Sequence, residues 1–388
     1  MKTVFYWSPC LTKVGTLKST INSAIALSKY SKEKYIVKII NSCGEWDEYS
    51  EIFKKNKVEV INFRYKFYSF LPKNGFLLSR ISYLIIILFS FLPLKRILQC
   101  EKPDFIIMHL ITSLPIILNN FYNFNTKFIL RISGFPKLNF LRKKLWKISS
   151  KNIFKITCPT KDLLFNLKNL EIFSEDKVFY LQDAIINIKN YISKNKKDEF
   201  NLGPKSKNFK NYFLSVGRLT KQKNYSYLIS EFASYFKNNE DDKLLIIGEG
   251  EEKNKLYKLI KENKLSENIF LLGKMDNVYP FMKNARALIL SSLWEEVGFV
   301  IVEAAFSNLF VISSNCPNGP REFLEDGKAG YLFKSNQKNE LYKKLEYFKN
   351  KENYLEKYKI KAKKNSMNFT LFRHHIALQK ILLNENKA

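Results

Sequence analysis

Short apolar runs alternate along the chain with longer stretches in which apolar residues recur at helical spacing. The opening shows the pattern clearly: run 3–7 (TVFYW), a helical stretch from about residue 15, and run 35–40 (YIVKII). Strand, helix and parallel strand in this order are typical of α/β proteins. Further strand-like runs follow at 58–63, 104–109, 127–132, 153–158 and 178–181, and after residue 206 in YFLSVG, KLLIIGEG, NIFLLG, ALILSS and LFVISS. The pattern predicts an α/β fold of doubly wound sheets.

A polar, Lys-rich stretch at 187–206, with Gly203-Pro204, separates two series of strands and helices. Clusters of this kind mark loops and domain boundaries. We therefore expect two Rossmann-like domains, 1–190 and 207–365, that face a central cleft and are joined by a linker at 191–206. The last stretch, 366–388, contains the amphipathic segment FTLFRHHIALQKILL. We expect it to form a helix that packs back on the first domain, with His374 and His375 on its solvated side.

Residues 76–98 are unusually apolar, but their uncharged core, 81–94, is shorter than the ~20 residues that a membrane span needs. Pro93 shortens it further. The segment is either a buried or surface-docked helix, or a helix lying on a bilayer with Arg80, Lys95 and Arg96 at anionic headgroups. A full span is disfavoured.

The composition adds a net charge of +29, with 65 Lys and Arg against 36 Asp and Glu. Nucleic acid, anionic lipid and a biased composition rich in Lys, Asn, Ile, Phe and Tyr are competing explanations. Lys far outnumbers Arg, which disfavours base reading and hence a nucleic-acid partner. The five cysteines are scattered without a CxxC, so neither a disulfide framework nor a zinc site is indicated. A cytoplasmic protein is expected, because the first residues also lack a signal-peptide pattern.

Candidate chemistry follows four strands of the second half. Arg218 and Lys223 come just after one strand and can clamp a diphosphate and stabilise it as a leaving group. Glycine turns at Gly248 and before Met275 follow the next two strands. The segment SSLWEEVGFVIVEAA follows the fourth, with Glu295 in a loop and a helix opening near Gly298, whose N–H groups suit a phosphate. Because the carboxyl ends of parallel strands share one edge, these residues are expected to face one crevice.

The first half offers fewer candidates. Gly15 lies in the first strand-to-helix loop, where a glycine can let the backbone approach a phosphate. His109 ends one strand, and Arg131 and Ser133 end the next. A ligand at this edge would meet all four, although a single Gly or His is more often structural.

Together these motifs resemble the family 4 type of GT-B glycosyltransferases, a group of retaining, nucleotide-sugar-dependent enzymes also called group 1. The resemblance covers about residues 210–335 and is weaker in the first half, where LITSLP and RISGFP carry it. The motifs are Gly217-Arg218-Leu219 with Lys223-Asn224, Gly248-Glu249-Gly250, Phe270-Leu271-Leu272-Gly273, and Glu295, Gly298 and Glu303-Ala304. Arg131-Ile132-Ser133-Gly134 stands where many relatives have a His, and Gln182-Asp183-Ala184 replaces a common N-G-x-D segment.

The resemblance implies roles for the residues. Arg218 and Lys223 would bind the donor diphosphate, Glu303 the ribose, and Glu295 the transferred sugar or the positive charge at its anomeric carbon. The backbone of Gly298, Phe299 and Val300 would meet phosphate, that near Met275 the base, and Gly15 the β-phosphate from across the cleft. His109, Arg131 and Ser133 would lie on the acceptor or sugar side.

The expected protein is a metal-independent retaining transferase that needs no cofactor. Its partners would be a UDP- or GDP-linked sugar and a glycan or lipid-linked glycan acceptor for lipopolysaccharide, O-antigen or capsule, at the inner face of the cytoplasmic membrane. A GT-B nucleotide-sugar epimerase or phosphorylase is the alternative within enzymes. A basic nucleic-acid-binding protein is the alternative from another class.

Overall fold

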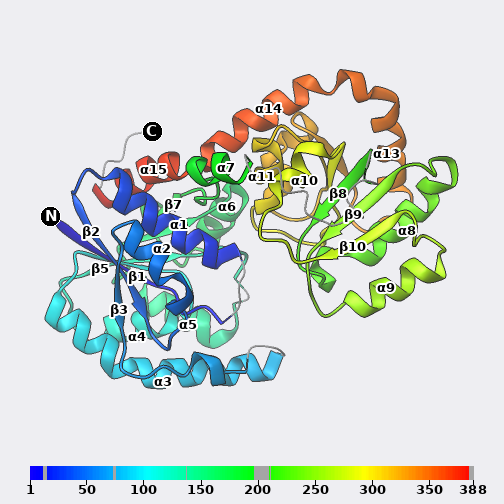
Figure 1. Ribbon diagram of the computed structural model, residues 1–388. Helices are drawn as coiled ribbons and strands as arrows, with labels where there is room; N and C mark the ends of the chain where they lie inside the picture. Colours follow the sequence, from blue (N-terminus) through cyan, green and yellow to red (C-terminus); the bar gives the residue numbers. More distant parts are fainter. Residues whose placement is uncertain (12–14, 73–75, 137, 196–208, 210, 384–388) are drawn as a thin grey trace. The chain divides into compact units, whose positions relative to one another are not determined.

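The computed structural model describes residues 1–11, 15–72, 76–136, 138–195, 209 and 211–383 (Figure 1). Contacts divide the chain into two compact units. Unit 1 comprises Met1–Ile185 and Leu371–Ala388, and unit 2 comprises Ile186–Thr370. The expected linker at 191–206 begins inside a helix, α7 (Ile188–Asn195), and its remaining residues lie outside the described part of the chain.

Unit 1 is built on a seven-stranded sheet with the order β3-β2-β1-β4-β5-β6-β7, and every pairing is parallel. The direction of winding reverses between β1 and β4, which is where open α/β sheets place ligands. Its strands are β1 (Lys2–Trp7), β2 (Tyr35–Asn41), β3 (Glu59–Asn62), β4 (Phe105–Met108), β5 (Lys127–Arg131), β6 (Lys155–Cys158) and β7 (Val178–Tyr180).

Helices cover both faces of this sheet and enclose two apolar cores (Figure 1). The C-terminal helix α15 belongs to unit 1 and packs against α1 over one of these cores. The α-helices of unit 1 are α1 (Gly15–Tyr30), α2 (Ser50–Lys55), α3 (Phe76–Glu101), α4 (Ser113–Phe121), α5 (Phe140–Ser149), α6 (Lys161–Asn169) and α15 (Leu371–Leu383).

One expectation about the helices of unit 1 is wrong. His374 and His375 are 2% and 3% exposed rather than solvated, because α15 turns this polar pair toward α1. Helix α3 contains Pro93 and continues beyond the apolar segment to Glu101. A proline removes one helical hydrogen bond, and the apolar contacts of Leu94 and Leu98 beyond it hold the helix against the core.

Unit 2 has a six-stranded parallel sheet with the order β10-β9-β8-β11-β12-β13. Its winding reverses between β8 and β11. The strands are β8 (Tyr212–Val216), β9 (Lys243–Ile247), β10 (Ile269–Gly273), β11 (Ala287–Leu290), β12 (Phe310–Ser314) and β13 (Tyr331–Phe333). Besides α7, the α-helices are α8 (Tyr225–Tyr235), α9 (Lys253–Glu262), α10 (Tyr279–Asn284), α11 (Phe299–Phe306), α12 (Gly319–Phe323), α13 (Glu340–Lys351) and α14 (Glu356–Ser366). The predicted class, two doubly wound α/β units, is confirmed.

Candidate active site

The candidate residues of unit 2 gather at the point where the winding of its sheet reverses. Arg218 and Lys223 follow β8, and Glu295 follows β11, the strand beside it. Adjacent parallel strands that continue in opposite directions leave a crevice beyond their carboxyl ends. The structure therefore brings together residues that are more than 70 positions apart in the sequence.

Lys223 and Glu295 form an ion pair at the centre of this edge. Their side chains are only 14% and 8% exposed, and the Ser292 hydroxyl donates a 2.5 Å hydrogen bond to the same carboxylate oxygen, Oε1. The neighbouring Glu296 is exposed. Of two adjacent glutamates in the sequence, the structure thus places Glu295 in the interior of the site.

Hydrogen bonds hold the two loops that carry this pair against each other. The Ser291 hydroxyl donates to the backbone carbonyl of Lys223 (2.8 Å), and the N–H of Leu293 donates to the backbone carbonyl of Gln222 (2.8 Å). The Gln222 amide returns a 2.8 Å bond to the carbonyl of Trp294. Each loop donates hydrogen bonds to the backbone of the other, so the spacing of Lys223 and Glu295 is fixed before any ligand binds.

Arg218 differs from Lys223 in being exposed. Its Nη2 makes one long contact, 3.4 Å, with the Gln222 side chain. An exposed guanidinium keeps its planar set of donors available for a phosphate. The site therefore offers one solvent-facing cation and one cation already held by a carboxylate.

Glycines let the turns after β8, β9 and β10 pack closely. Gly248 has a φ of +154°, and a Cβ atom there would lie 1.8 Å from the carbonyl oxygen of Gly217. The Gly248 N–H donates to Gly273 (2.8 Å), and the Gly217 N–H donates to Ile247 (2.9 Å). A side chain at Gly248 would force these turns apart, which explains why the I-x-G-x-G turn needs glycine.

Helix α11 follows the loop that carries Glu295, with Gly298 as its N-cap in the left-handed region (φ +75°). The first turn contains Phe299 and Val300, whose N–H groups are available to an anion by their place in the helix. Glu303 is half-buried on the same helix. Burial, followed by the charge of Glu303, raises the pKa of Tyr279, so this carboxylate lies near the start of α10. Met275, which follows β10, is half-buried.

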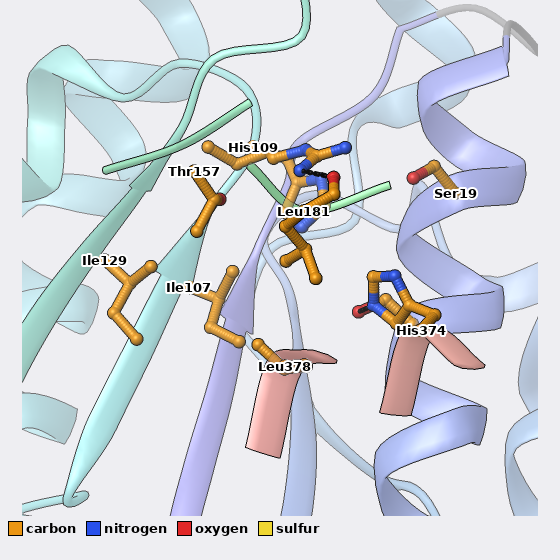
Figure 2. A pocket seen from close by; sticks show the side chains of 10 residues that line it. Ser19, Ile107, His109, Ile129, Thr157, Leu181, His374 and Leu378 are labelled. Carbon is orange, nitrogen blue, oxygen red and sulfur yellow. Dashed lines mark hydrogen bonds between the residues drawn. The ribbon is translucent and has the colours of Figure 1, made fainter. Parts of the chain in front are cut away.

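In unit 1, His109 and Arg131 line a small internal cavity of about 10 Å³ (Figure 2). Among the described residues, His109 Nδ1, Arg131 Nε and Thr157 Oγ1 have no hydrogen-bond partner and border this cavity. The volume suits a single water molecule. Burial, then Arg131 and His374, lower the pKa of His109 well below its usual value, so the ring is neutral.

Arg131 is 3% exposed and has a structural partner. Its guanidinium donates 2.6 Å hydrogen bonds to Asp183 and to the carbonyl of Leu181, and Ser19 of α1 donates to the same carboxylate (2.5 Å). The departure from the family pattern at Gln182-Asp183-Ala184 thus supplies the partner of Arg131. Ser133 is half-buried after β5, and Gly15 is the first residue of α1.

His374 of α15 continues this polar network. Its Nδ1 lies 2.6 Å from the carbonyl of Gln182, which only accepts, so Nδ1 carries the proton. Its Nε2 then accepts from the Ser23 hydroxyl (2.8 Å), which in turn accepts from Tyr6 (2.9 Å). Sequence reasoning missed Asp183 and His374, because their partners lie 52 and 351 positions away.

Comparison with known proteins identifies the second half of the chain. Residues 196–365 match the family model described as glycosyl transferases group 1. These residues belong to the group 1 glycosyl transferases. The match contains Arg218, Lys223, Glu295 and Glu303.

Two relatives are similar to longer parts of the chain. An uncharacterized glycosyltransferase of Methanocaldococcus jannaschii is 32% identical over 59% of the chain. The N-acetylgalactosamine-N,N'-diacetylbacillosaminyl-diphospho-undecaprenol 4-alpha-N-acetylgalactosaminyltransferase of Campylobacter jejuni is 28% identical over 63% of it. The aligned parts cover 60% and 66% of these two relatives.

A solved structure, that of Anabaena HepE in complex with UDP and glucose, has the same fold. The TM-score is 0.73 over 99% of this chain and 100% of the other, at 14% identity. The two parallel sheets with their intervening helices therefore have the GT-B fold.

Proposed function

We propose that this protein is a retaining glycosyltransferase that uses a nucleotide-diphosphate sugar. In this reaction the bond between the anomeric carbon and the diphosphate oxygen breaks. The acceptor oxygen bonds to that carbon on the same face, and the acceptor's hydroxyl proton passes to the departing diphosphate. One C–O bond and one O–H bond break, and one bond of each kind forms, so no further reactant is needed.

The observation that carries the proposal is the Lys223–Glu295 pair beside the exposed Arg218, at the point where the winding of the doubly wound sheet reverses. Arg218 and Lys223 would neutralise the diphosphate as it gains charge in the transition state. These cations would take the place of a metal ion, which stays a prediction.

The two carboxylates would act at different ends of the donor. Glu295 is only 7% exposed, so its charge is weakly screened and would favour positive charge at the anomeric carbon. Glu303, half-buried on α11, would accept hydrogen bonds from the ribose hydroxyls. Binding of the diphosphate would draw Lys223 away from Glu295, which frees that carboxylate for the sugar.

The relatives support a particular class of substrates. The Campylobacter relative is named for a diphospho-undecaprenol-linked acceptor, and HepE was solved with UDP. We propose a UDP- or GDP-linked donor and a lipid-linked glycan acceptor in the synthesis of a surface polysaccharide. Such an acceptor would place the enzyme at the cytoplasmic face of the membrane.

Thermal unfolding in the presence of UDP, GDP and their sugars tests the donor site. A ligand at 100 times its Kd stabilises the native state by about 2.7 kcal/mol. The correct nucleotide should raise the Tm, and Arg218→Ala and Glu303→Ala should abolish the rise. Lys221→Ala, an exposed lysine on the same loop, is the matched control. No rise with any nucleotide would contradict the proposal.

Product analysis separates transfer from the related chemistries. With donor and lipid-linked acceptor, a glycosylated acceptor and one nucleoside diphosphate per transfer are expected. Sugar release that requires orthophosphate would instead indicate a phosphorylase. Inversion within the donor sugar without any acceptor would indicate an epimerase.

A further inference from the structure

Helix α3 in unit 1 has a buried side and an opposite side whose large apolar residues are exposed. On the buried side, Ile86, Leu94 and Leu98, together with the small Ser82 and Ser90, are each at most 1% exposed. On the other side, Leu84, Leu88 and Leu92 are 60%, 73% and 70% exposed. A helix that is apolar all round is normally buried. The open side of α3 therefore calls for a covering partner.

A second helix extends this open apolar surface. In α5, Phe140, Leu141 and Ile148 are 79%, 74% and 59% exposed. Helix α4 contacts both α3 and α5, and Figure 1 shows the three helices on the same side of unit 1. Arg80 of α3 and Arg142 of α5 lie near each other, since burial and then the charge of Arg80 lower the pKa of Arg142. We call the exposed residues of α3 and α5 the α3–α5 surface.

The charge of this surface points to an anionic partner. Between residues 60 and 161 the sequence has only two acids, Glu101 and Asp104, against seventeen Lys and Arg. Lys143, Lys144 and Lys147 of α5 are exposed beside its apolar residues. A broad apolar area bordered by cations matches an interface of anionic headgroups over acyl chains. A soluble acidic protein would match the charge but not the apolar area.

We propose that the α3–α5 surface docks unit 1 on an anionic phospholipid bilayer, with α3 lying in the plane of the interface. The leucines of α3 and the apolar residues of α5 would enter the acyl boundary, and the lysines of α5 would meet phosphates. The contact is independent of the donor site. It rests on the proposed function only in that a membrane-linked acceptor would be presented at the same interface.

The structure also favours lying on the membrane over crossing it. By length and composition, residues Leu78–Glu101 are sufficient for a span, and 28% of the most apolar window is buried in the protein. A span would expose the packed side of α3, including Ile86, Leu94 and Leu98, and would leave the core of unit 1 open.

Sedimentation of the full chain with vesicles tests the docking surface. Binding to phosphatidylcholine vesicles that contain phosphatidylglycerol should exceed binding to phosphatidylcholine alone, and should weaken in high salt. Leu88→Glu should reduce binding about tenfold or more. Phe165→Glu is the matched control, since Phe165 of α6 is similarly exposed, at 66%. Equal losses in the two variants would overturn the proposal.

The charge requirement has its own matched pair of variants. Lys143→Glu with Lys144→Glu should weaken binding about thirtyfold. Lys363→Glu with Lys364→Glu changes an equivalent adjacent, exposed pair on α14 of unit 2 and should leave binding within about twofold. An identical loss from both pairs would show general attraction by net charge and would refute a specific surface.

Three further measurements keep the outcome unambiguous. Extraction from membranes by detergent alone, and not by alkaline carbonate, would indicate a span and overturn the proposal. A dimer that Leu88→Glu dissociates, without vesicle binding, would show that a second copy covers the surface. The nucleotide-induced rise in Tm should be unchanged in the surface variants. Its absence from the unaltered protein would count against the donor site alone, since vesicle binding does not use that site.

Discussion

Replacing Lys223 by alanine should destabilise unit 2 much more than a surface lysine would. The substitution leaves the Glu295 carboxylate, 8% exposed, with the Ser292 hydroxyl as its remaining side-chain hydrogen bond in the described structure. Removing one partner of a fully buried pair costs about 3–5 kcal/mol. Because Lys223 is 14% exposed and water can partly enter, we expect about 2–3 kcal/mol.

The loss is large enough to measure by thermal unfolding. For a unit of this size, about 1 kcal/mol corresponds to roughly 2–4 °C of Tm, so Lys223→Ala should lower the Tm by roughly 4–12 °C. Lys221→Ala, two residues away and exposed, should stay within about 0.5 kcal/mol of the unaltered protein. Circular dichroism during heating records both.

A double-mutant cycle decides whether the pair itself is responsible. Lys223→Met combined with Glu295→Gln removes both charges and should recover much of the loss seen in Lys223→Met alone. A coupling energy of about 1 kcal/mol or more is expected. The reasoning is refuted if the two single effects simply add, or if Lys223→Ala behaves like Lys221→Ala.

Three other outcomes follow from the same structure. Glu295→Gln removes the carboxylate that competes for Lys223, so nucleotide diphosphate should bind more tightly by calorimetry while transfer is lost; weaker binding would contradict the competition. Gly248→Ala should lower the free energy of unfolding, measured in urea, by about 2 kcal/mol or more, because the added Cβ would lie 1.8 Å from a carbonyl oxygen. Gly327→Ala, which has open space around it, should lower it by only about 1–2 kcal/mol. Burial lowers the pKa of His374 to about 4, so the folded state resists protonation and stability falls from pH 6.5 toward 4, by about 3 kcal/mol in all. His374→Gln should make that pH dependence less steep, while buried His109, whose pKa is also lowered, still contributes. An unchanged slope would contradict the assignment.

The second-half site could be predicted because each of its parts is local. Arg218 and Glu295 both lie within five residues of the end of a strand, and parallel strands bring their carboxyl ends to one edge. The periodicity of the sequence is enough to locate such strands. It could not decide between Glu295 and Glu296, since adjacent residues share the same local pattern. In the structure Glu295 is buried and pairs with Lys223, whereas Glu296 is exposed.

The network of unit 1 could not be predicted, because it depends on contacts between distant segments. The sequence places Asp183 near a domain boundary, where a carboxylate is usually solvated. Its partner Arg131 comes from β5, and Ser19 comes from α1. The polar pair His374-His375 likewise looks solvent-facing until α15 packs on α1. Only the tertiary structure brings these groups together and buries them.

The pairing of Lys223 with Glu295 gives the site a selectivity that its net charge alone would not. In a chain of charge +29, most anions are attracted to many places on the surface. A single phosphate at the site must compete with a carboxylate that is already bound to Lys223. A diphosphate can contact the exposed Arg218 through one phosphate while the other displaces Glu295, so two favourable contacts offset one lost pair. Under the proposed function, that exchange also places an unpaired carboxylate next to the sugar only when a diphosphate is bound, which links recognition of the donor to the charge that its transfer requires.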